Sequence, residues 1–440
     1  MPTIEEQYQA KHPTSQETYA DAMDIFPDGV THDNRFLMPF PVVATHASGS
    51  RKWDVDGNEY VDYVMGHGAL LLGHGHPDVV QAVTDKMTQG THLGTNTKDE
   101  IEWGRLVQKL IPSAERVRFT SSGTEATLLA LRLVRAFTGK NRVIKFQSHF
   151  HGWHDFLLAG SGRNMGGIAP EVAALSYVLQ PNDIAAVERT LEEHDDIAAV
   201  ILEPTGAGMG QIPVYPEFLQ ELRDVTTKHG VVLIFDEVVT GFRISTGGAQ
   251  ALYGVTPDVT TLAKILAGGV PGGAVSGRAD ILNMIAHDES NGDNRVGHAG
   301  TFNANPLAAA AGTAALKLVA TGEHNARADA TATVLRRGIN DLMTRMEIPG
   351  CCYGMASIFQ LRLGMQCQCT DDEHQHPAES QGATPPALVR QLRLAALNSG
   401  MDLMGGRSGL VSSAHTDADV QETLGHFEEA FTALRADGRV

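Results

Sequence analysis

Two strand-like runs in the middle of the chain each end on a charged side chain. Residues 231–235 read Val-Val-Leu-Ile-Phe, five apolar positions in a row that are mostly β-branched or aromatic. Such a run predicts a strand buried on both faces, as in a parallel sheet. It ends at Asp236 and Glu237, and a second run over residues 258–263 ends at Lys264. Ligands bind at the carboxyl ends of strands in open α/β sheets, so these charged residues are candidates for a functional site.

Lys264 is the sharper of these candidates. It stands between a predicted strand and a glycine-rich turn over residues 268–273. A lone lysine in a loop is often no more than a solvated surface residue. Desolvation at a strand end would instead lower the pKa of the amine and make it a nucleophile. The strand-end Asp236, 28 residues earlier, makes a catalytic pair the better hypothesis.

The rest of the pattern alternates strand-like and helix-like segments, which predicts an α/β fold. The Asp56-Gly57 dipeptide between alternating runs indicates a hairpin. Residues 216–230 carry apolar positions at helical spacing and stop at a glycine. Another apolar run ends on Glu203, again at a predicted strand end, and Ser-Gly-Thr at residues 122–124 opens an amphipathic helix.

Composition narrows the range of functions. The chain has 440 residues, of which 42% are hydrophobic and 20% charged, and its formal net charge is −18. This charge argues against nucleic acid or an anionic membrane as a partner, and no apolar run has the length of a membrane span. The four cysteines crowd between Cys351 and Cys369, unlike a disulfide framework, so we expect a cytoplasmic location.

The segment from Asp236 onward resembles the class III aminotransferases, which are fold-type I pyridoxal-phosphate enzymes. The matching motifs are Asp-Glu-Val-x-x-Gly-Phe-Arg and Ala-Lys-x-x-x-Gly-Gly-x-Pro-Gly-Gly. The resemblance implies that Lys264 holds pyridoxal 5'-phosphate (PLP) covalently and that Asp236 binds the pyridine nitrogen. An anionic partner keeps that nitrogen protonated, so the ring can accept the electrons of a carbanion.

The same resemblance implies the fold and its division into domains. We expect a large α/β domain with a mainly parallel seven-stranded sheet flanked by helices, and a small α+β domain at the C-terminus. The expected boundaries are residues 1–75 for an N-terminal arm and meander, 76–310 for the PLP-binding domain and 311–440 for the small domain.

A phosphate-binding cup is expected at Ser122, Gly123 and Thr124. A glycine at a helix N-terminus lets free amides approach a phosphate, and the helix dipole favours the dianion. A Ser-Gly-Thr motif alone more often marks a helix cap. Its position ahead of the two motifs above, in family order, favours the phosphate site.

Further cofactor contacts follow from the resemblance. Phe150 takes the place of the aromatic ring that stacks on the cofactor, and His151 beside it is expected to line the pocket. Glu203 matches an acidic residue near the cofactor and substrate, and Val238 is expected to contact the cofactor. Thr301 lies in a Gly-Thr-x-x-x-Asn-Pro-Leu-Ala segment whose threonine reaches the phosphate of the neighbouring subunit. We therefore expect a homodimer with shared active sites.

Substrate contacts are expected from Arg35, His67, Arg407 and Glu203. An arginine suits a substrate carboxylate because its planar guanidinium binds both oxygens, although Arg35 is equally typical of a solvated arm. His67 stands where the aminomutases of the family carry an aromatic residue, so the pocket is expected to differ there.

No metal is expected in either of two histidine-rich segments. The first matches a family turn that leads into a helix, and the second has zinc-ligand types at a spacing that fits no common zinc motif. The residues concerned are His67, His74 and His76 in the first, and Cys367, Cys369, His374 and His376 in the second.

The expected function is amino-group transfer between small molecules. The chain resembles the aminomutase branch of the family, and residues 27–35 and 66–77 resemble transaminases of D-aryl amino acids such as D-phenylglycine. That likeness implies transfer from a D-aryl amino acid to 2-oxoglutarate, giving a 2-oxo acid and L-glutamate with inversion. Two alternatives stay open: a glutamate-1-semialdehyde 2,1-aminomutase-like enzyme or β-amino acid transaminase, and a PLP-binding protein without catalysis.

Overall fold

The computed structural model describes residues 2–365 and 384–440, which form two compact units. One unit comprises residues 77–325, and the other joins residues 1–76 with residues 326–440. This grouping differs from the three consecutive domains expected above, because the first 76 residues share a sheet with the C-terminal segment. No helix in the described ranges is both long and apolar enough to cross a membrane.

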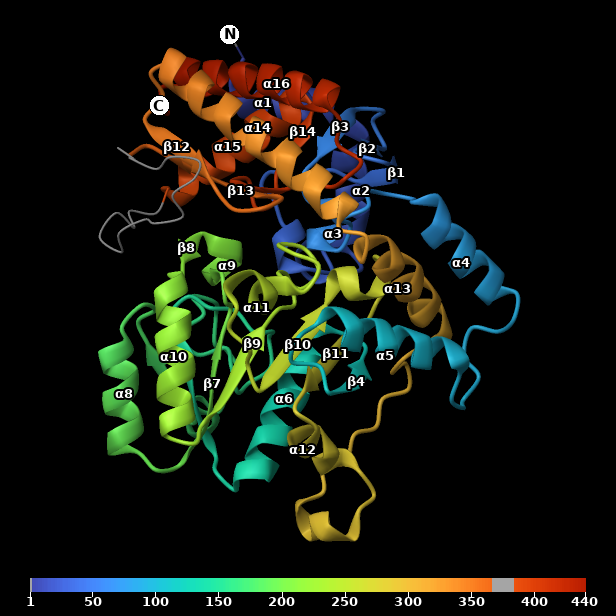
Figure 1. Ribbon diagram of the computed structural model, residues 1–440. Helices are drawn as coiled ribbons and strands as arrows, with labels where there is room; N and C mark the ends of the chain where they lie inside the picture. The colour runs from blue at the N-terminus through green and yellow to red at the C-terminus, as the bar shows by residue number, and fades with distance from the viewer. Residues whose placement is uncertain (1, 366–383) are drawn as a thin grey trace. The chain divides into compact units, whose positions relative to one another are not determined.

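The unit of residues 77–325 is built on a seven-stranded sheet in the order β4-β11-β10-β9-β7-β5-β6 (Figure 1). Its strands are β4 (Arg116–Thr120), β5 (Arg142–Phe146), β6 (Ser176–Leu179), β7 (Ile197–Leu202), β9 (Val232–Asp236), β10 (Val259–Ala263) and β11 (Gly273–Gly277). The pairs from β10 to β6 are parallel, and only β11 runs against its two neighbours. The predicted mainly parallel sheet of seven strands is confirmed.

Helices cover both faces of this sheet. The helices of this unit are α4 (Pro77–Met87), α5 (Lys98–Leu110), α6 (Gly123–Thr138), α7 (Pro170–Ala173), α8 (Ile184–Glu193), α9 (Ala207–Gly210), α10 (Pro216–Lys228), α11 (Gly248–Tyr253), α12 (Ala279–Leu282) and α13 (Pro306–Val319), and α6, α8 and α10 pack on the strands. Short elements complete the unit, namely β8 (Ile212–Pro213), η3 (Lys264–Ala267), η4 (Asn283–Ile285) and η5 (Glu289–Asn294).

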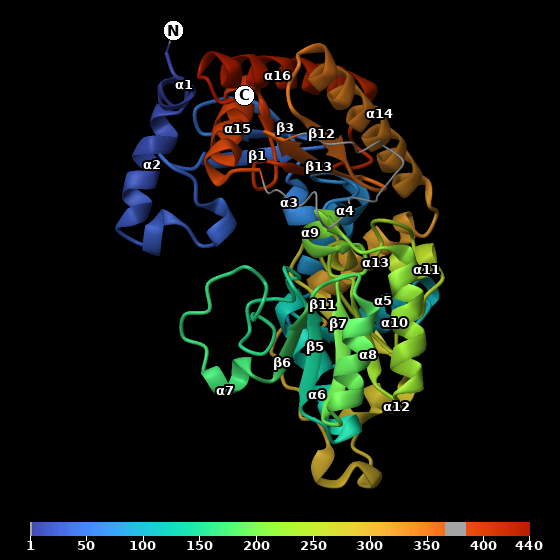
Figure 2. The same ribbon diagram turned by 90° about the vertical axis from the view of Figure 1, so that its left-hand side faces the viewer.

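The sheet is buried from both sides because successive side chains of a strand point to opposite faces. In β9, Val232 and Ile234 join the apolar cluster that includes α6, whereas Leu233 and Phe235 join the cluster of α8 and α10. Figures 1 and 2 show α8 and α10 lying side by side. The continuous apolar run that predicted this strand therefore reflects burial on both faces.

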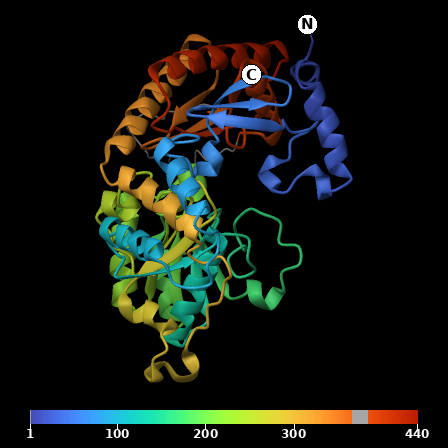
Figure 3. The same cartoon turned by 90° about the vertical axis from the view of Figure 1, so that its right-hand side faces the viewer.

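The second unit holds two small sheets, ordered β1-β2-β3-β14 and β12-β13-β15. Its elements are α1 (Ile4–Lys11), α2 (Pro13–Met23), η1 (Pro27–Gly29), η2 (Asp33–Arg35), β1 (Ala44–Ser48), β2 (Arg51–Asp54), β3 (Glu59–Asp62), α3 (Met65–Gly68), α14 (Glu323–Arg345), β12 (Gly350–Tyr353), β13 (Ile358–Leu363), α15 (Pro386–Ser399), β14 (Met401–Asp402), β15 (Ser408–Leu410) and α16 (Asp417–Ala436). β3 and β14 pair in parallel, so an N-terminal segment and a C-terminal segment of the chain share one sheet. Figure 3 shows α14 in orange and α16 in red beside the blue strands of this unit, and their apolar faces share one core.

Trp103 of α5 connects the core of the large unit to the turn that follows Lys264. Its side chain is fully buried and stacks on Phe119, with ring centroids 3.9 Å apart. The indole N–H donates to the carbonyl of Leu266 at 2.9 Å, two residues beyond Lys264. α13 closes over the ring at Gly312, where an added Cβ would lie 2.4 Å from the indole nitrogen.

We expect Trp103→Ala to lower the free energy of unfolding by roughly 3–5 kcal/mol, because it removes a buried aromatic side chain and leaves a cavity. Urea denaturation followed by circular dichroism measures this change. Trp153→Ala is the control, because that side chain is 76% exposed and should change stability by less than about 0.5 kcal/mol. Equal midpoints for the two variants would contradict the role given to Trp103.

Candidate active site

Four chemically active side chains of the large unit lie at the carboxyl ends of adjacent strands. Asp236 ends β9, Lys264 follows β10 and Glu203 follows β7. His151 lies in the loop after β5, which is next to β7 in the sheet. The parallel topology alone brings these residues to one edge, where ligands bind in open α/β sheets.

Asp236 is held in a fixed orientation by three donors from three segments. The Thr261 hydroxyl donates to Oδ1 at 3.0 Å, and the backbone N–H of Val238 donates to the same oxygen at 3.1 Å. The Nδ1 of His151 lies 2.7 Å from Oδ2. A buried carboxylate needs such partners, and here they aim it from the end of the strand.

His151 supports Asp236, a contact that the sequence did not reveal. The imidazole is buried, and this burial lowers its pKa, although the hydrogen bond to Asp236 opposes the shift. The neutral ring therefore donates from Nδ1 to the carboxylate. Its Nε2 is buried and has no hydrogen-bond partner among the described residues. The two residues are 85 positions apart in the chain, so adjacency in sequence gave no signal.

Lys264 is the first residue of η3 and has a left-handed backbone, with φ at +54°. Residues other than glycine seldom adopt this conformation, and such strain is concentrated at functional sites. Burial lowers the pKa of the Lys264 amine, while the charges of Asp236 and Glu203 raise it. A lowered pKa leaves more of the amine neutral and nucleophilic, as the sequence predicted.

Glu203 is a second carboxyl group at the same edge, with different surroundings. Its Oε1 accepts a hydrogen bond from the backbone N–H of Phe150 at 2.8 Å. Burial raises the pKa of Glu203 to about 8, and the charge of Asp236 adds to this. Glu203 is therefore largely protonated near neutral pH.

The predicted phosphate cup forms the N-terminus of α6. Ser122 is its N-cap, and the hydroxyl of Ser122 accepts from the N–H of Glu125 at 3.2 Å, so the capping role is real. An added Cβ at Gly123 would lie 3.0 Å from both methyl groups of Val238. Gly152 has φ at +92°, and its added Cβ would meet the Thr124 hydroxyl at 2.7 Å. Because glycine has no side chain, the segments that contain Val238 and Gly152 can lie close to the free backbone amides at the start of α6.

These residues fit PLP. Helix α6 has 16 residues and begins at Gly123, which has no side chain to cover the free amides of the first turn. These amides suit a phosphate dianion. The oriented carboxylate of Asp236 suits a protonated pyridine nitrogen, and the Lys264 amine suits the aldehyde. Phe150, the predicted stacking ring, has the Arg163 guanidinium 4.3 Å from its centroid.

Thr301 lies on the surface of the large unit. Its side chain is exposed, and its carbonyl lies 2.6 Å from Nε2 of His92. Exposed apolar side chains surround this contact: Phe302 is 61% exposed and Leu93 is 51% exposed. The ring of Phe302 meets that of His92 edge-on, so the two segments form one surface.

The predicted substrate residues Arg35, His67 and Arg407 belong to the other unit. Arg35 is exposed and donates to the Thr31 hydroxyl at 2.8 Å. His67 has φ at +56° and stacks on the ring of His32, with centroids 4.9 Å apart. Arg407 is half-buried, and this burial lowers the pKa of its guanidinium.

The histidine segments weighed as metal sites differ in what the structure describes. Nε2 of His74 in the first segment lies 2.7 Å from Oδ2 of Asp62. The second segment, with Cys367, Cys369, His374 and His376, lies outside the described residues.

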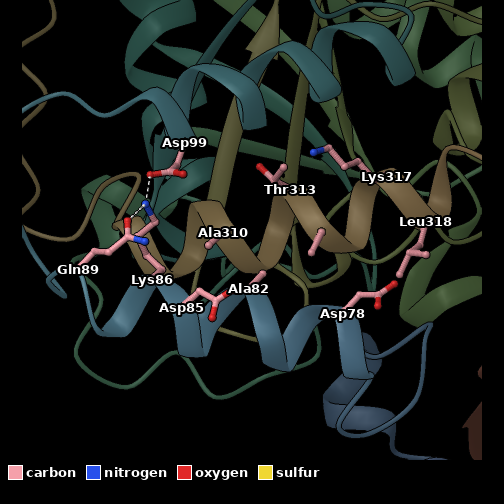
Figure 4. Close-up of a pocket in the computed structure, with 11 residues that line it drawn as sticks. Asp78, Ala82, Asp85, Lys86, Gln89, Asp99, Ala310, Thr313, Lys317 and Leu318 are labelled. Atoms are coloured by element: carbon pink, nitrogen blue, oxygen red, sulfur yellow. Dashed lines mark hydrogen bonds and ion pairs between the residues drawn. The ribbon is translucent and has the colours of Figure 1, made fainter.

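A hollow of about 360 Å³ lies between α4 and α13, away from the predicted site residues (Figure 4). Asp85 and Lys86 line it from α4, and Thr313 and Lys317 line it from α13. The Lys86 amine pairs with Asp99 at 2.7 Å. The hollow contains no residue of the Asp236, Lys264 and Glu203 group, so it is not part of that site.

The family model for class-III aminotransferases matches residues 33–359. The chain belongs to this family. Glutamate-1-semialdehyde 2,1-aminomutase of Desulfotalea psychrophila is 38% identical over 435 residues, covering 96% of this chain and 98% of the relative. The enzyme of that name from Methanocella arvoryzae is 42% identical over 367 residues, covering 81% and 85%.

Solved structures agree with this placement. An omega-transaminase from Sphaerobacter thermophilus superposes with a TM-score of 0.87 at 32% identity, covering 96% of this chain and 98% of that one. A transaminase with PLP bound gives a TM-score of 0.88 at 28% identity, covering 97% and 99%. The predicted family, fold and class of enzyme are confirmed, and PLP is supported as the cofactor of this class-III aminotransferase.

The relatives correct the predicted substrate. Transamination of a D-aryl amino acid was the expected function, and it is wrong: relatives 38–42% identical to this chain are glutamate-1-semialdehyde 2,1-aminomutases. The prediction relied on short matches at residues 27–35 and 66–77. Such short matches cover few residues, whereas the aminomutase relatives match over 81–96% of this chain.

We expect Glu203→Gln to change the pH dependence of stability. Because the pKa of Glu203 is raised by burial to about 8, the folded protein holds a proton that the unfolded chain releases above about pH 4.5. Wild-type stability should therefore decline as pH rises from about 5 to 8, and the glutamine variant should lose part of that decline. Melting temperatures across this range test it. Exposed Glu221→Gln is the control, and parallel curves for all three proteins would contradict the assignment.

Proposed function

We propose that this class-III aminotransferase is a PLP-dependent 2,1-aminomutase that acts on glutamate-1-semialdehyde, exchanging the amino and carbonyl groups on neighbouring carbons of one substrate. The observation that carries the proposal is the meeting of Asp236, Lys264 and Glu203 at one sheet edge. Relatives at 38–42% identity that bear the aminomutase name support the substrate.

The residues divide the chemistry among them. When bound, PLP supplies a ring that accepts the electron pair of a C–H bond beside the substrate nitrogen. Asp236, fixed by its three donors, holds the proton on the ring nitrogen. The Lys264 amine takes a proton from one substrate carbon and delivers it to the next. Ser122, Gly123 and Thr124 hold the phosphate.

Glu203 is proposed to act as a neutral neighbour of this site. Because it is largely protonated near neutral pH, it does not compete with Asp236 for the positive ring. Phe150, whose backbone N–H donates to Glu203, would stack on the cofactor ring, and Val238 would also contact the cofactor. Either Arg35 or Arg407 is proposed to bind the substrate carboxylate, and His67 is proposed as a further substrate contact.

An isomerase reaction needs no second substrate, and this gives the test. The purified holoenzyme should convert glutamate-1-semialdehyde into the isomeric amino ketone without any added 2-oxo acid, and the rate should not respond to one. Lys264→Ala should lower this turnover by on the order of 10³-fold or more, because the base is lost. Mass spectrometry of the product and the cofactor absorbance follow the reaction.

The second candidate function is transamination to a separate 2-oxo acid. His67 favours it, because the aminomutase branch carries an aromatic residue there, and the omega-transaminase at 32% identity supports it. Turnover that requires a 2-oxo acid and an amine donor, with no isomerisation of glutamate-1-semialdehyde, would replace the aminomutase proposal with this one.

We further propose a homodimer in which Thr301 completes the phosphate site of the partner subunit. The exposed threonine and the apolar side chains of Phe302 and Leu93 around it support such a contact. Because a two-fold axis relates the subunits, each subunit supplies its Thr301 to the phosphate site of the other.

Mixing two inactive variants tests the shared site. Lys264→Ala and Thr301→Asp each inactivate a homodimer, but in the heterodimer both lesions fall in one site and the other site is intact. Random reassociation should recover roughly one quarter of wild-type activity, because half of the dimers are mixed and each has one working site. A mixture with heterodimers demonstrated by native mass spectrometry and no recovered activity would contradict the arrangement.

A further inference from the structure

Lys145 is a lysine inside the sheet of the large unit, a place where this residue type is seldom found. It lies in β5 with an exposed fraction of 0%. Its amine donates to the carbonyls of His149 at 3.1 Å, Leu157 at 2.7 Å and Ala159 at 2.5 Å. The three donors of an ammonium group thus meet three acceptors, which satisfies a buried cation without a carboxylate.

The three carbonyls belong to one loop, which runs from β5 toward β6 and carries Phe150 and His151. The loop closes on itself where the N–H of Ser148 donates to the carbonyl of Gly160 at 2.6 Å. The amine of Lys145 lies inside this loop and holds its two arms together. Nothing in the proposed chemistry uses Lys145 itself, since its amine is bonded to backbone and does not face a substrate.

A second connection leads from Lys145 to Glu203. His149, whose carbonyl binds the Lys145 amine, accepts the backbone N–H of Glu203 at its Nδ1, 3.0 Å away. Burial lowers the pKa of Lys145 to about 8, and the nearby Glu203 opposes that shift. Lys145 therefore supports Phe150 and His151 through the loop, and it supports Glu203 through His149.

We propose that Lys145 is a positioning residue of the active site: by binding three carbonyls of the loop after β5, it sets where Phe150 and His151 stand against the cofactor. The inference rests on the proposed function for the roles of those two residues. Removing the amine leaves three buried carbonyls without a donor, so the loop must move or admit water to satisfy them. His151 then loses its alignment with Asp236.

Lys145→Met tests this, because methionine keeps an unbranched side chain that lacks only the terminal nitrogen position, and it removes every donor. The visible circular dichroism of the bound cofactor should change, and the dissociation constant for PLP should rise roughly tenfold or more. The kcat should fall on the order of 10²-fold with a smaller change in KM, as expected when reacting groups are misplaced by about 1 Å. The first two measurements need no substrate.

Two matched variants separate positioning from stability. Lys140→Met makes the same replacement just before β5 and should leave the cofactor signal unchanged. Ile144→Ala truncates the neighbouring residue of β5, which packs on the opposite face of the sheet, so it should lower the melting temperature without altering the cofactor dichroism. A loss of stability in Lys145→Met with a wild-type cofactor signal and kcat would overturn the proposal.

Lys145→Gln provides a second test if the methionine variant does not fold. Its amide retains two donors on a shorter side chain, so an intermediate change in the dichroism and PLP affinity is expected. Wild-type values for this variant would also overturn the proposal. Failure of the proposed function is seen separately, as absent isomerisation by the wild-type enzyme with an intact cofactor signal.

Discussion

The anchoring of one buried carboxylate, Asp236, is the constraint on which the site depends. Its three donors come from the neighbouring strand β10, from the loop after β5 and from the turn that follows Asp236 itself. A charge at the end of a central strand is costly without such partners. The strand order β10-β9-β7-β5 is what allows distant segments to supply them. The fold and the chemistry are therefore linked through a single ionic group.

Asp236 and Glu203 are both carboxyl groups at strand ends of the same edge, but their surroundings differ. Donors from three segments orient Asp236. Glu203 accepts backbone hydrogen bonds from Phe150, Gly208 and Met209, but burial outweighs these donors and, with the charge of Asp236, raises the pKa of Glu203 to about 8. The proton on Glu203 therefore reflects its burial and not a lack of hydrogen bonds.

Strands, strand-end charges and the hairpin could be predicted from the sequence, because each depends on a local pattern of residues. The apolar runs identified β9 and β10, and the charged residues that follow them identified Asp236 and Lys264, because parallel strands end at one edge. The hairpin at Asp56-Gly57 is present as β2 and β3, with Gly57 at φ +84°. These features need no knowledge of distant contacts.

Features that depend on distant contacts carried no signal in the sequence. His151 reads as a pocket residue beside Phe150, and only the fold brings it to Asp236, 85 positions later. No motif in the sequence marks Lys145 or Trp103, because the partners of Lys145 are backbone carbonyls of a loop and the partner of Trp103 is the carbonyl of Leu266. The D-aryl prediction relied on two short segments, and the relatives that match over most of the chain are aminomutases.

The contacts that hold Lys264 and Asp236 all lie within the large unit. Lys264 is held in its strained backbone by β10 on one side and by a turn that Trp103 fixes on the other. Asp236 is held by the sheet and its neighbours. None of these contacts involves Arg35, His67 or Arg407, which stand in the other unit. The motifs around Asp236 and Lys264 record contacts within the large unit, so they identify the family without identifying the substrate.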